Sequence, residues 1–188
     1  AIVTSRRDIV VRSPDGTIEP ISGVAGDMVW SGWSPAPETE LDHSWPTWSP
    51  DGSRIACFRL HDNGTSGLFV AEVGGVASAE LVQLEDRLPI YLQWRADGRY
   101  LAMLSQRLDE QGDRLCLAMT DPDRVGHEQV LAEGTPLFFT WYGADVAAFV
   151  GHPTNTANRL ALLDPAQLHS IRLLPGMPHN FCAPVVAG

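Results

Sequence analysis

The stretch HSWPTWSPDGSRIACF, residues 43–58, decides the fold of this chain. Trp48 stands just before a Pro-Asp-Gly turn, and the short apolar segment 54–58 follows that turn. Asp51 and Gly52 suit a tight hairpin, because glycine accepts the positive φ that such a turn requires. The stretch therefore predicts two antiparallel strands, with a bulky aromatic ring at the end of the first.

The same pattern recurs twice along the chain. QWRADGRYLAML carries Trp94 and TWYGADVAAFV carries Trp141, so that the three tryptophans are spaced by about 46 residues. Asp97 and Gly98 repeat the tight turn, whereas in the third copy the glycine precedes the aspartate. The final stretch FCAPVVAG aligns with the same position of the repeat but lacks the tryptophan. Each of the four copies carries a proline: Pro46, Pro89, Pro136 and Pro184. A fixed period indicates a repeat architecture.

Each copy also carries two further apolar segments. GLFVAEVGG (67–75), RLCLAMTDPD (114–123) and RLALLDPAQ (159–167) follow the turns, DIVVRSPDG (8–16) is an earlier copy, and another short apolar run follows each. Four short strands with a period of about 45 residues are typical of a β-propeller blade. Nearly continuous apolar strands fit sheets that are buried on both faces. We therefore predict an all-β propeller of four-stranded antiparallel blades, with at most one helical turn, at 164–171.

The repeats divide the chain into units. Residues 1–23 form a partial blade, 24–43 a long inter-blade loop, 44–87, 88–134 and 135–177 three blades, and 178–188 a lone inner strand. That strand either completes the partial blade and closes a four-bladed ring, or belongs to a further blade of a larger propeller. We favour the larger propeller, because four blades is the lower limit of the architecture. In a segment, open blade edges would be unprotected strands prone to self-association.

The repeated tryptophans have a structural explanation. A ring at the end of an innermost strand can fill the wedge between adjacent blades, which contributes about 2–3 kcal/mol by buried area. We therefore assign Trp48, Trp94 and Trp141 to blade packing, and Asp51–Gly52 and Asp97–Gly98 to the turns that follow.

Composition excludes several classes of function. The net charge is −10, with 23 acidic against 13 basic residues, which argues against a nucleic-acid partner. Every basic residue is arginine, so no lysine can form a Schiff base or hold a phosphate in a P-loop. Cys57, Cys116 and Cys182 lack metal-ligand spacing and are expected to be buried apolar residues. No apolar run is long enough for a transmembrane helix, and no cofactor is implied.

WSPDGSRIACF and WRADGRYLAML resemble the WD-like repeat of TolB-type propellers and of the propeller domains of prolyl-oligopeptidase-family enzymes. The resemblance covers nearly the whole chain as repeat architecture and departs from the pattern in WYGADVAAFV. It implies a propeller of about six blades and a bacterial periplasmic or cell-envelope location, with a cytoplasmic one as the alternative. This repeat serves many roles, so it implies fold more than function.

Candidate binding residues gather in the loops expected on one face. Loops between the second and third strands of a blade share a face with the links between blades, and the longest departure from the repeat, 22–45, lies there. Trp30 and Trp33 in it are either anchors for a partner or a packed lid. Loops 61–67, 109–113 and 152–158 should join that face, with four expected rim residues: His61, Asp62, His152 and Asn155. His43 and His179 precede inner strands and point to the central channel.

No sequence motif marks catalysis or a metal site. The chain has no G-x-S-x-G elbow and no H-E-x-x-H, and its histidines and acids lack ligand spacing. We therefore expect a non-catalytic scaffold that binds a protein or peptide, basic or neutral by charge complementarity. The alternatives are the substrate-gating propeller of a serine peptidase whose catalytic domain lies outside this chain, and a propeller that binds a small ligand or glycan.

Overall fold

The computed structural model describes residues 2–3, 9–12, 14–20, 42–61, 63–73, 78–108, 114–152, 155–167 and 171–174. Within these ranges every regular element is a β strand, and the strands form one three-stranded and three four-stranded sheets. The first sheet has β1 (Ile2–Val3), β2 (Ile9–Arg12) and β3 (Ile18–Pro20). The second has β4 (Asp42–Trp48), β5 (Arg54–Leu60), β6 (Ser66–Glu72) and β7 (Ser78–Leu84).

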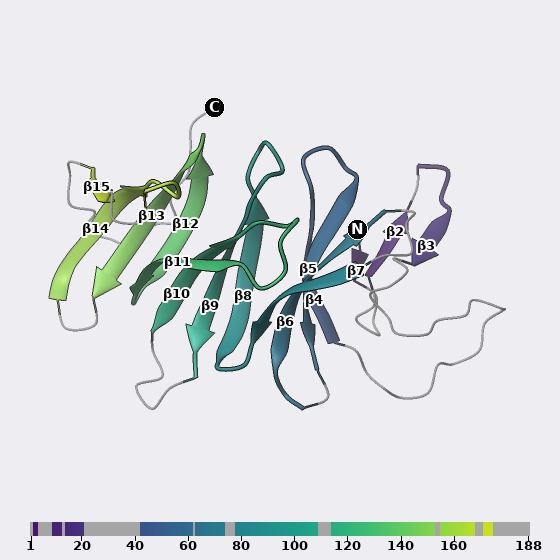
Figure 1. Cartoon of the computed structure of the whole chain (residues 1–188), viewed down its shortest axis with the longest axis horizontal. Helices are drawn as coiled ribbons and strands as arrows, with labels where there is room; N and C mark the ends of the chain where they lie inside the picture. Colours follow the sequence, from purple (N-terminus) through teal and green to yellow (C-terminus); the bar gives the residue numbers. More distant parts are fainter. Residues whose placement is uncertain are drawn as a thin grey trace.

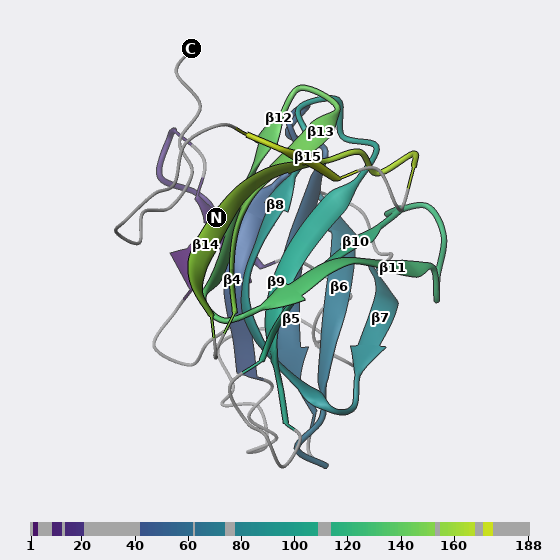
Figure 2. The same ribbon diagram turned by 90° about the vertical axis from the view of Figure 1, so that its left-hand side faces the viewer.

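The other two sheets repeat the second. β8 (Arg87–Trp94), β9 (Leu101–Arg107), β10 (Leu115–Thr120) and β11 (Glu128–Gly134) form the third. β12 (Leu137–Tyr142), β13 (Asp145–His152), β14 (Asn155–Leu163) and β15 (Ile171–Leu173) form the fourth. In every sheet the strands pair antiparallel in chain order, and the described sheets lie face to face (Figure 1; Figure 2). The predicted fold class, a propeller of four-stranded antiparallel blades, is confirmed.

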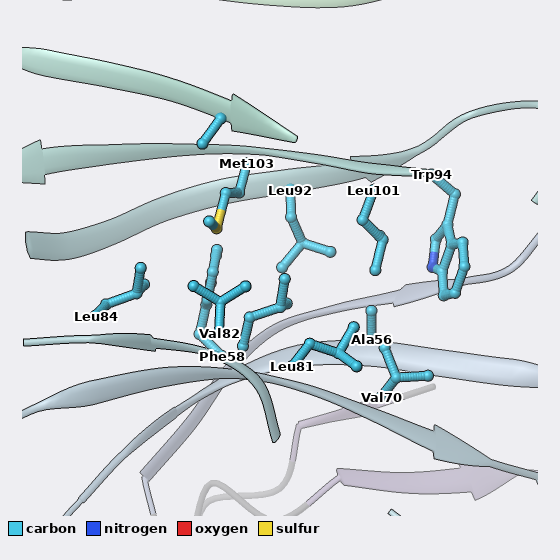
Figure 3. Packing of buried hydrophobic residues seen from close by; sticks show 12 residues of the cluster. Ala56, Phe58, Val70, Leu81, Val82, Leu84, Leu92, Trp94, Leu101 and Met103 are labelled. Atoms are coloured by element: carbon cyan, nitrogen blue, oxygen red, sulfur yellow. The ribbon is translucent and has the colours of Figure 1, made fainter. Parts of the chain in front are cut away.

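The core lies between the sheets. Between the second and third sheets, side chains from β5, β6 and β7 meet Leu92, Trp94, Leu101 and Met103 from β8 and β9 (Figure 3). Between the third and fourth sheets, a second cluster surrounds Leu137 and Phe139. Both faces of the third sheet are therefore buried, which explains why its strands are nearly continuously apolar.

The repeated tryptophans connect neighbouring inner strands. The indole N–H of Trp94 donates to the backbone carbonyl of Thr47 at 3.1 Å, and that of Trp141 donates to the carbonyl of Gln93 at 3.2 Å. Each acceptor immediately precedes the tryptophan of the previous unit. The same bond therefore repeats from sheet to sheet and places β4, β8 and β12 side by side.

The turns after the tryptophans are closed by aspartate. Asp51 accepts hydrogen bonds from the hydroxyls of Ser49 and Ser53 and from the Ser53 amide, and Gly52 has φ +73°. The Ser49 hydroxyl, more than the other partners, lowers the pKa of Asp51 to about 2. Although the third copy departs from the motif, Tyr142 pairs with Asp145 across a two-residue turn in which Gly143 has φ +63°. A tight turn therefore forms in the third copy as well, although the glycine there precedes the aspartate.

One local expectation is outside the described residues in part, and another needs correction. Residues 164–167 form a hydrogen-bonded turn in which the Asp164 carboxylate accepts from the Ala166 amide, whereas residues 168–170 of the predicted helical turn lie outside the described residues. The loop expected at 152–158 is shorter, because β13 continues to His152 and β14 already begins at Asn155. Antiparallel pairing of β13 with β14 outcompetes the turn tendency of the polar sequence there.

Candidate protein-binding face

One end of the sheets gathers the connections expected to carry function. Ser66, the first residue of β6, pairs with Leu60 at the end of β5 and with Leu84 at the end of β7. Residues 85–86, which link β7 to β8, follow directly. The amide of Leu108, just after β9, donates to the carbonyl of Asp86 at 2.7 Å. The β5–β6 turn, the link and the β9–β10 connection therefore share one end of the sheets, which we call the link end. The opposite end, with turns 49–53, 95–99 and 143–144, is the turn end.

Three leucines are exposed at the link end. Leu60 closes β5, Leu88 is the second residue of β8, and Leu108 follows β9; they are 39%, 44% and 53% exposed. Surface leucines scattered singly need no explanation, but three exposed leucines at the same end of two neighbouring sheets make that end a candidate for contact with a partner. We call these three residues the leucine patch.

Ion pairs flank the leucine patch on the third sheet. Glu133 accepts from Arg107, whose guanidinium also reaches Asp86 at 3.3 Å, and Arg114 lies 3.5 Å from Glu133. Deeper between the sheets, the largely buried Arg87 makes a bidentate pair with Glu128, at 2.6 and 2.7 Å. Charges next to the patch are therefore largely paired within the protein and hold its strand ends in place.

His61 is the one expected rim residue whose side chain the structure describes. Its Nε2 lies 2.9 Å from Oε1 of Glu80, and its ring centroid is 5.9 Å from that of Phe69. Gly67 lies beside this pair, where a Cβ would collide with Oε1 of Glu80. His61 is thus fixed against the outer strand by a carboxylate.

The other candidate residues are placed only in part. His43 pairs in register with Arg59, and His152 pairs with Asn155 at the β13–β14 turn; only their backbone positions are described. His152 and Asn155 share the link end, because β13 and β14 correspond to β9 and β10. Trp30, Trp33, Asp62 and His179 lie outside the described residues.

Trp45 is a residue that the sequence did not single out as a site. It lies in a bulge of β4, where the register shifts between Ser44 and Thr47, and its φ is +56°. Its ring centroid is 6.3 Å from that of Tyr91. A residue before proline normally adopts an extended conformation, so the motif around Pro46 gave no signal of this geometry.

The turn end carries an open depression of about 510 Å³ between the second and third sheets. Asp51, Ser53, Glu72 and Asp123 line it together with Arg54 and Val73. The Arg54 guanidinium pairs with Asp123 at 2.7 Å, donates to the Gly98 carbonyl and lies 5.1 Å from the Trp94 ring. Arg54 therefore joins two sheets. It is the one cation among the described residues that line the depression, and it is already paired with Asp123.

Neither described cysteine has the environment of a nucleophilic thiol. Cys57 and Cys116 are free and buried, and burial raises the pKa of Cys57 to about 12 and also raises that of Cys116. A thiol with a raised pKa is a poor source of thiolate. The described ranges contain no group of three or more histidine, cysteine, aspartate or glutamate side chains arranged to hold a metal. They also contain no helix that could cross a membrane.

Comparison with solved structures identifies the kind of propeller. The chain superposes on an acylaminoacyl peptidase of Pyrococcus horikoshii with a TM-score of 0.63 and 17% identity, over 90% of this chain and 28% of the peptidase. It superposes on TolB of Acinetobacter baumannii with a TM-score of 0.56 and 11% identity, over 90% of this chain and 38% of TolB.

The β-propeller domain of the Trilobed protease from Pyrococcus furiosus is also similar, with a TM-score of 0.57 and 16% identity over 72% of this chain and 43% of that domain. The chain thus has a TolB-like propeller fold and spans less than half the length of these structures. No model of a known protein family matches the sequence, and no curated protein matches it.

Proposed function

We propose that this chain is a non-catalytic TolB-like propeller segment that binds a protein or peptide at its link end. The observation that carries the proposal is the leucine patch, three exposed leucines at the link end: one at the end of β5, one in β8 and one just after β9. An apolar centre flanked by paired charges has the composition of a binding surface.

The surrounding structure supports this assignment. The patch stands on strand ends that are fixed by buried cores and by the Arg107–Glu133 and Arg87–Glu128 pairs, so little ordering is needed on binding. The net charge of −10 favours a basic partner. TolB-like folds also occur in an envelope protein, and we place this chain in the periplasm or envelope, which fractionation of cells that express the tagged protein would test.

Substitution of the leucine patch tests the proposed binding. Leu88→Asp and Leu108→Asp should each weaken the binding of peptides selected on an array of short random peptides by about tenfold, because a charge replaces an apolar contact. Val125→Asp is the matched control, since Val125 is also exposed but lies in the β10–β11 connection at the turn end. Equal binding by all three variants would contradict the proposal.

A second candidate is the substrate-gating propeller of a prolyl-oligopeptidase-family peptidase. The likeness to an acylaminoacyl peptidase favours it, because that structure contains more than three times the length covered here. The full-length protein would then hydrolyse acylated or blocked peptides and would contain an α/β-hydrolase domain outside this chain. Absence of hydrolysis by the full-length protein would remove this candidate and leave the binding scaffold.

A further inference from the structure

Three aromatic rings form a row across three neighbouring sheets. Trp45 comes from β4, Tyr91 from β8 and Phe139 from β12, which are the first strands of their sheets. The Tyr91 and Phe139 rings stack with centroids 4.9 Å apart and planes inclined by 9°, and the Trp45 ring lies 6.3 Å from Tyr91 at 44°. The row therefore follows the inner strands, one ring from each.

Two of these rings are fixed by the fold. The Tyr91 hydroxyl accepts a hydrogen bond from the Phe139 amide at 2.9 Å and donates one to the Phe139 carbonyl at 3.1 Å. Phe139 is buried and Tyr91 is partly buried against the core between the third and fourth sheets. Their packing explains both residues without any ligand.

Trp45 at the end of the row is different. Its side chain is 53% exposed, although tryptophan is the largest apolar residue of the chain. It is also the single described non-glycine residue with a positive φ, +56°, a conformation that is costly for a bulky side chain. The fold thus holds a strained backbone in order to present a large ring to solvent, and strain of this kind concentrates at functional sites.

The exposed ring has a definite chemical preference. The face of an indole attracts a guanidinium or ammonium group, and tryptophan is the strongest aromatic partner for such cations. The protein itself uses this contact, since Arg54 lies over Trp94 and Arg95 lies 4.4 Å from the centroid of Tyr100. With a net charge of −10, the chain as a whole attracts cationic partners to such a ring.

We propose that Trp45 is the anchor of a peptide-binding site on the inner strands and takes an arginine or lysine side chain of the bound peptide over its indole face. This inference rests on the proposed function, to which it adds a contact residue on β4, the strand whose first residue, Asp42, pairs with Leu60 of the leucine patch, and a class of peptide. Tyr91 acts as a positioning residue, because its fixed ring backs the indole on one side.

The test separates binding from stability. The chain, its variants Trp45→Gly and Trp45→Asn, and the control Tyr142→Ala are probed on an array of short random peptides. The affinity of the strongest binder is then measured by fluorescence polarisation. Glycine and asparagine both accept a positive φ. Tyr142 is a matched control, because it is 51% exposed and lies on an inner strand but at the turn end.

We expect peptides rich in arginine or lysine to be enriched, and both Trp45 variants to bind them about tenfold more weakly. The melting temperatures of these variants should equal or exceed that of the parent, because the strain is relieved. Replacing the basic peptide residue by glutamine should weaken binding to the parent chain but not further weaken binding to Trp45→Asn.

Each contrary result has a defined meaning. Undiminished binding by the Trp45 variants, enrichment of peptides without basic residues, or a Tyr142→Ala variant that loses as much affinity would overturn the assignment of Trp45. A lower melting temperature of Trp45→Gly and Trp45→Asn without weaker binding would show that the ring is only structural. If the parent chain binds no peptide on the array, the proposed function itself fails together with this inference.

Discussion

The two described interfaces between four-stranded sheets share one bond and differ in how they are sealed. In both, a tryptophan indole donates to a carbonyl of the preceding inner strand. Around Trp94, Arg54 of the second sheet lies 5.1 Å from the ring centroid and pairs with Asp123, in the β10–β11 connection of the third sheet. Around Trp141, Arg95 likewise lies 5.9 Å from the ring centroid, and the Tyr91–Phe139 stack is an additional contact between the two sheets. The repeat thus fixes the register of the sheets, whereas the surrounding side chains adapt to each interface.

Replacement of the two tryptophans should reveal the largest difference in stability between the two interfaces. Trp94 is 8% exposed, and Trp94→Ala should lower the free energy of unfolding by about 3–5 kcal/mol, because it leaves a cavity and removes the ring beneath Arg54. Trp141 is only partly buried, so Trp141→Ala should cost about 2 kcal/mol. Urea denaturation followed by circular dichroism measures both. Equal losses would show that the shared bond outweighs the local packing.

The buried ion pair is the next test. Glu128→Gln leaves the largely buried charge of Arg87, whose side chain is 8% exposed, without its carboxylate partner in the third sheet, and should cost about 2–4 kcal/mol. Glu133→Gln is the matched control, because Glu133 pairs with the more exposed Arg107 and Arg114 and should cost about 1 kcal/mol or less. Thermal melts at neutral pH compare the two. A larger loss for Glu133→Gln would contradict this ranking.

The Tyr91 hydroxyl gives a smaller effect at the other interface. Tyr91→Phe preserves the stacked ring but leaves the Phe139 amide and carbonyl without the hydroxyl, which should cost about 1–2 kcal/mol. Tyr142→Phe, at a half-exposed residue, should leave stability unchanged. If Tyr91→Phe also leaves the free energy of unfolding unchanged in urea denaturation, the stacked rings stabilise this interface without the hydroxyl.

The smallest effect is expected from the turn aspartates. The Arg95 guanidinium, with the Arg99 amide, lowers the pKa of Asp97 from 3.8 to about 2. Because the folded pKa lies below the unfolded value, the stabilisation is present above about pH 5 and is lost as pH falls through 4 towards 2. Asp97→Asn should therefore reduce the acid dependence of the melting temperature between about pH 5 and 2. An unchanged acid slope would mean that other carboxylates dominate it.

The fold was predictable because its determinants repeat locally. Trp48 and Trp94 with their Asp-Gly turns mark the ends of the inner strands, and runs such as 54–58 reveal sheets that are covered on both faces. Among the described residues a few boundaries differ: β4 begins at Asp42 and β8 at Arg87, slightly before the predicted blades, and the loop at 152–158 is shorter, because the pairing of single residues decides where a strand ends.

The candidate site was less predictable, because its features depend on contacts between sheets. Leu60, Leu88 and Leu108 occupy different positions of the repeat, and only the strand register shows that all three lie at the link end. The left-handed backbone of Trp45 arises from a bulge that the residues around Pro46 do not specify. A register shift beside proline recurs at Pro89 in β8, but the positive φ of Trp45 and the exposed leucines each occur once among the described residues, so a periodic signal cannot carry them.

The indole bond has a consequence for the growth of such proteins. The unit that contains β8 offers its Gln93 carbonyl forward to the next unit, while its own Trp94 reaches backward to the one before. One segment thus contains both a donor and an acceptor for the hydrogen bonds that join neighbouring units. Duplication of residues 88–134 would supply both the carbonyl acceptor and the indole donor of this hydrogen bond. The protein could therefore gain or lose whole blades in evolution without a new kind of interface between them.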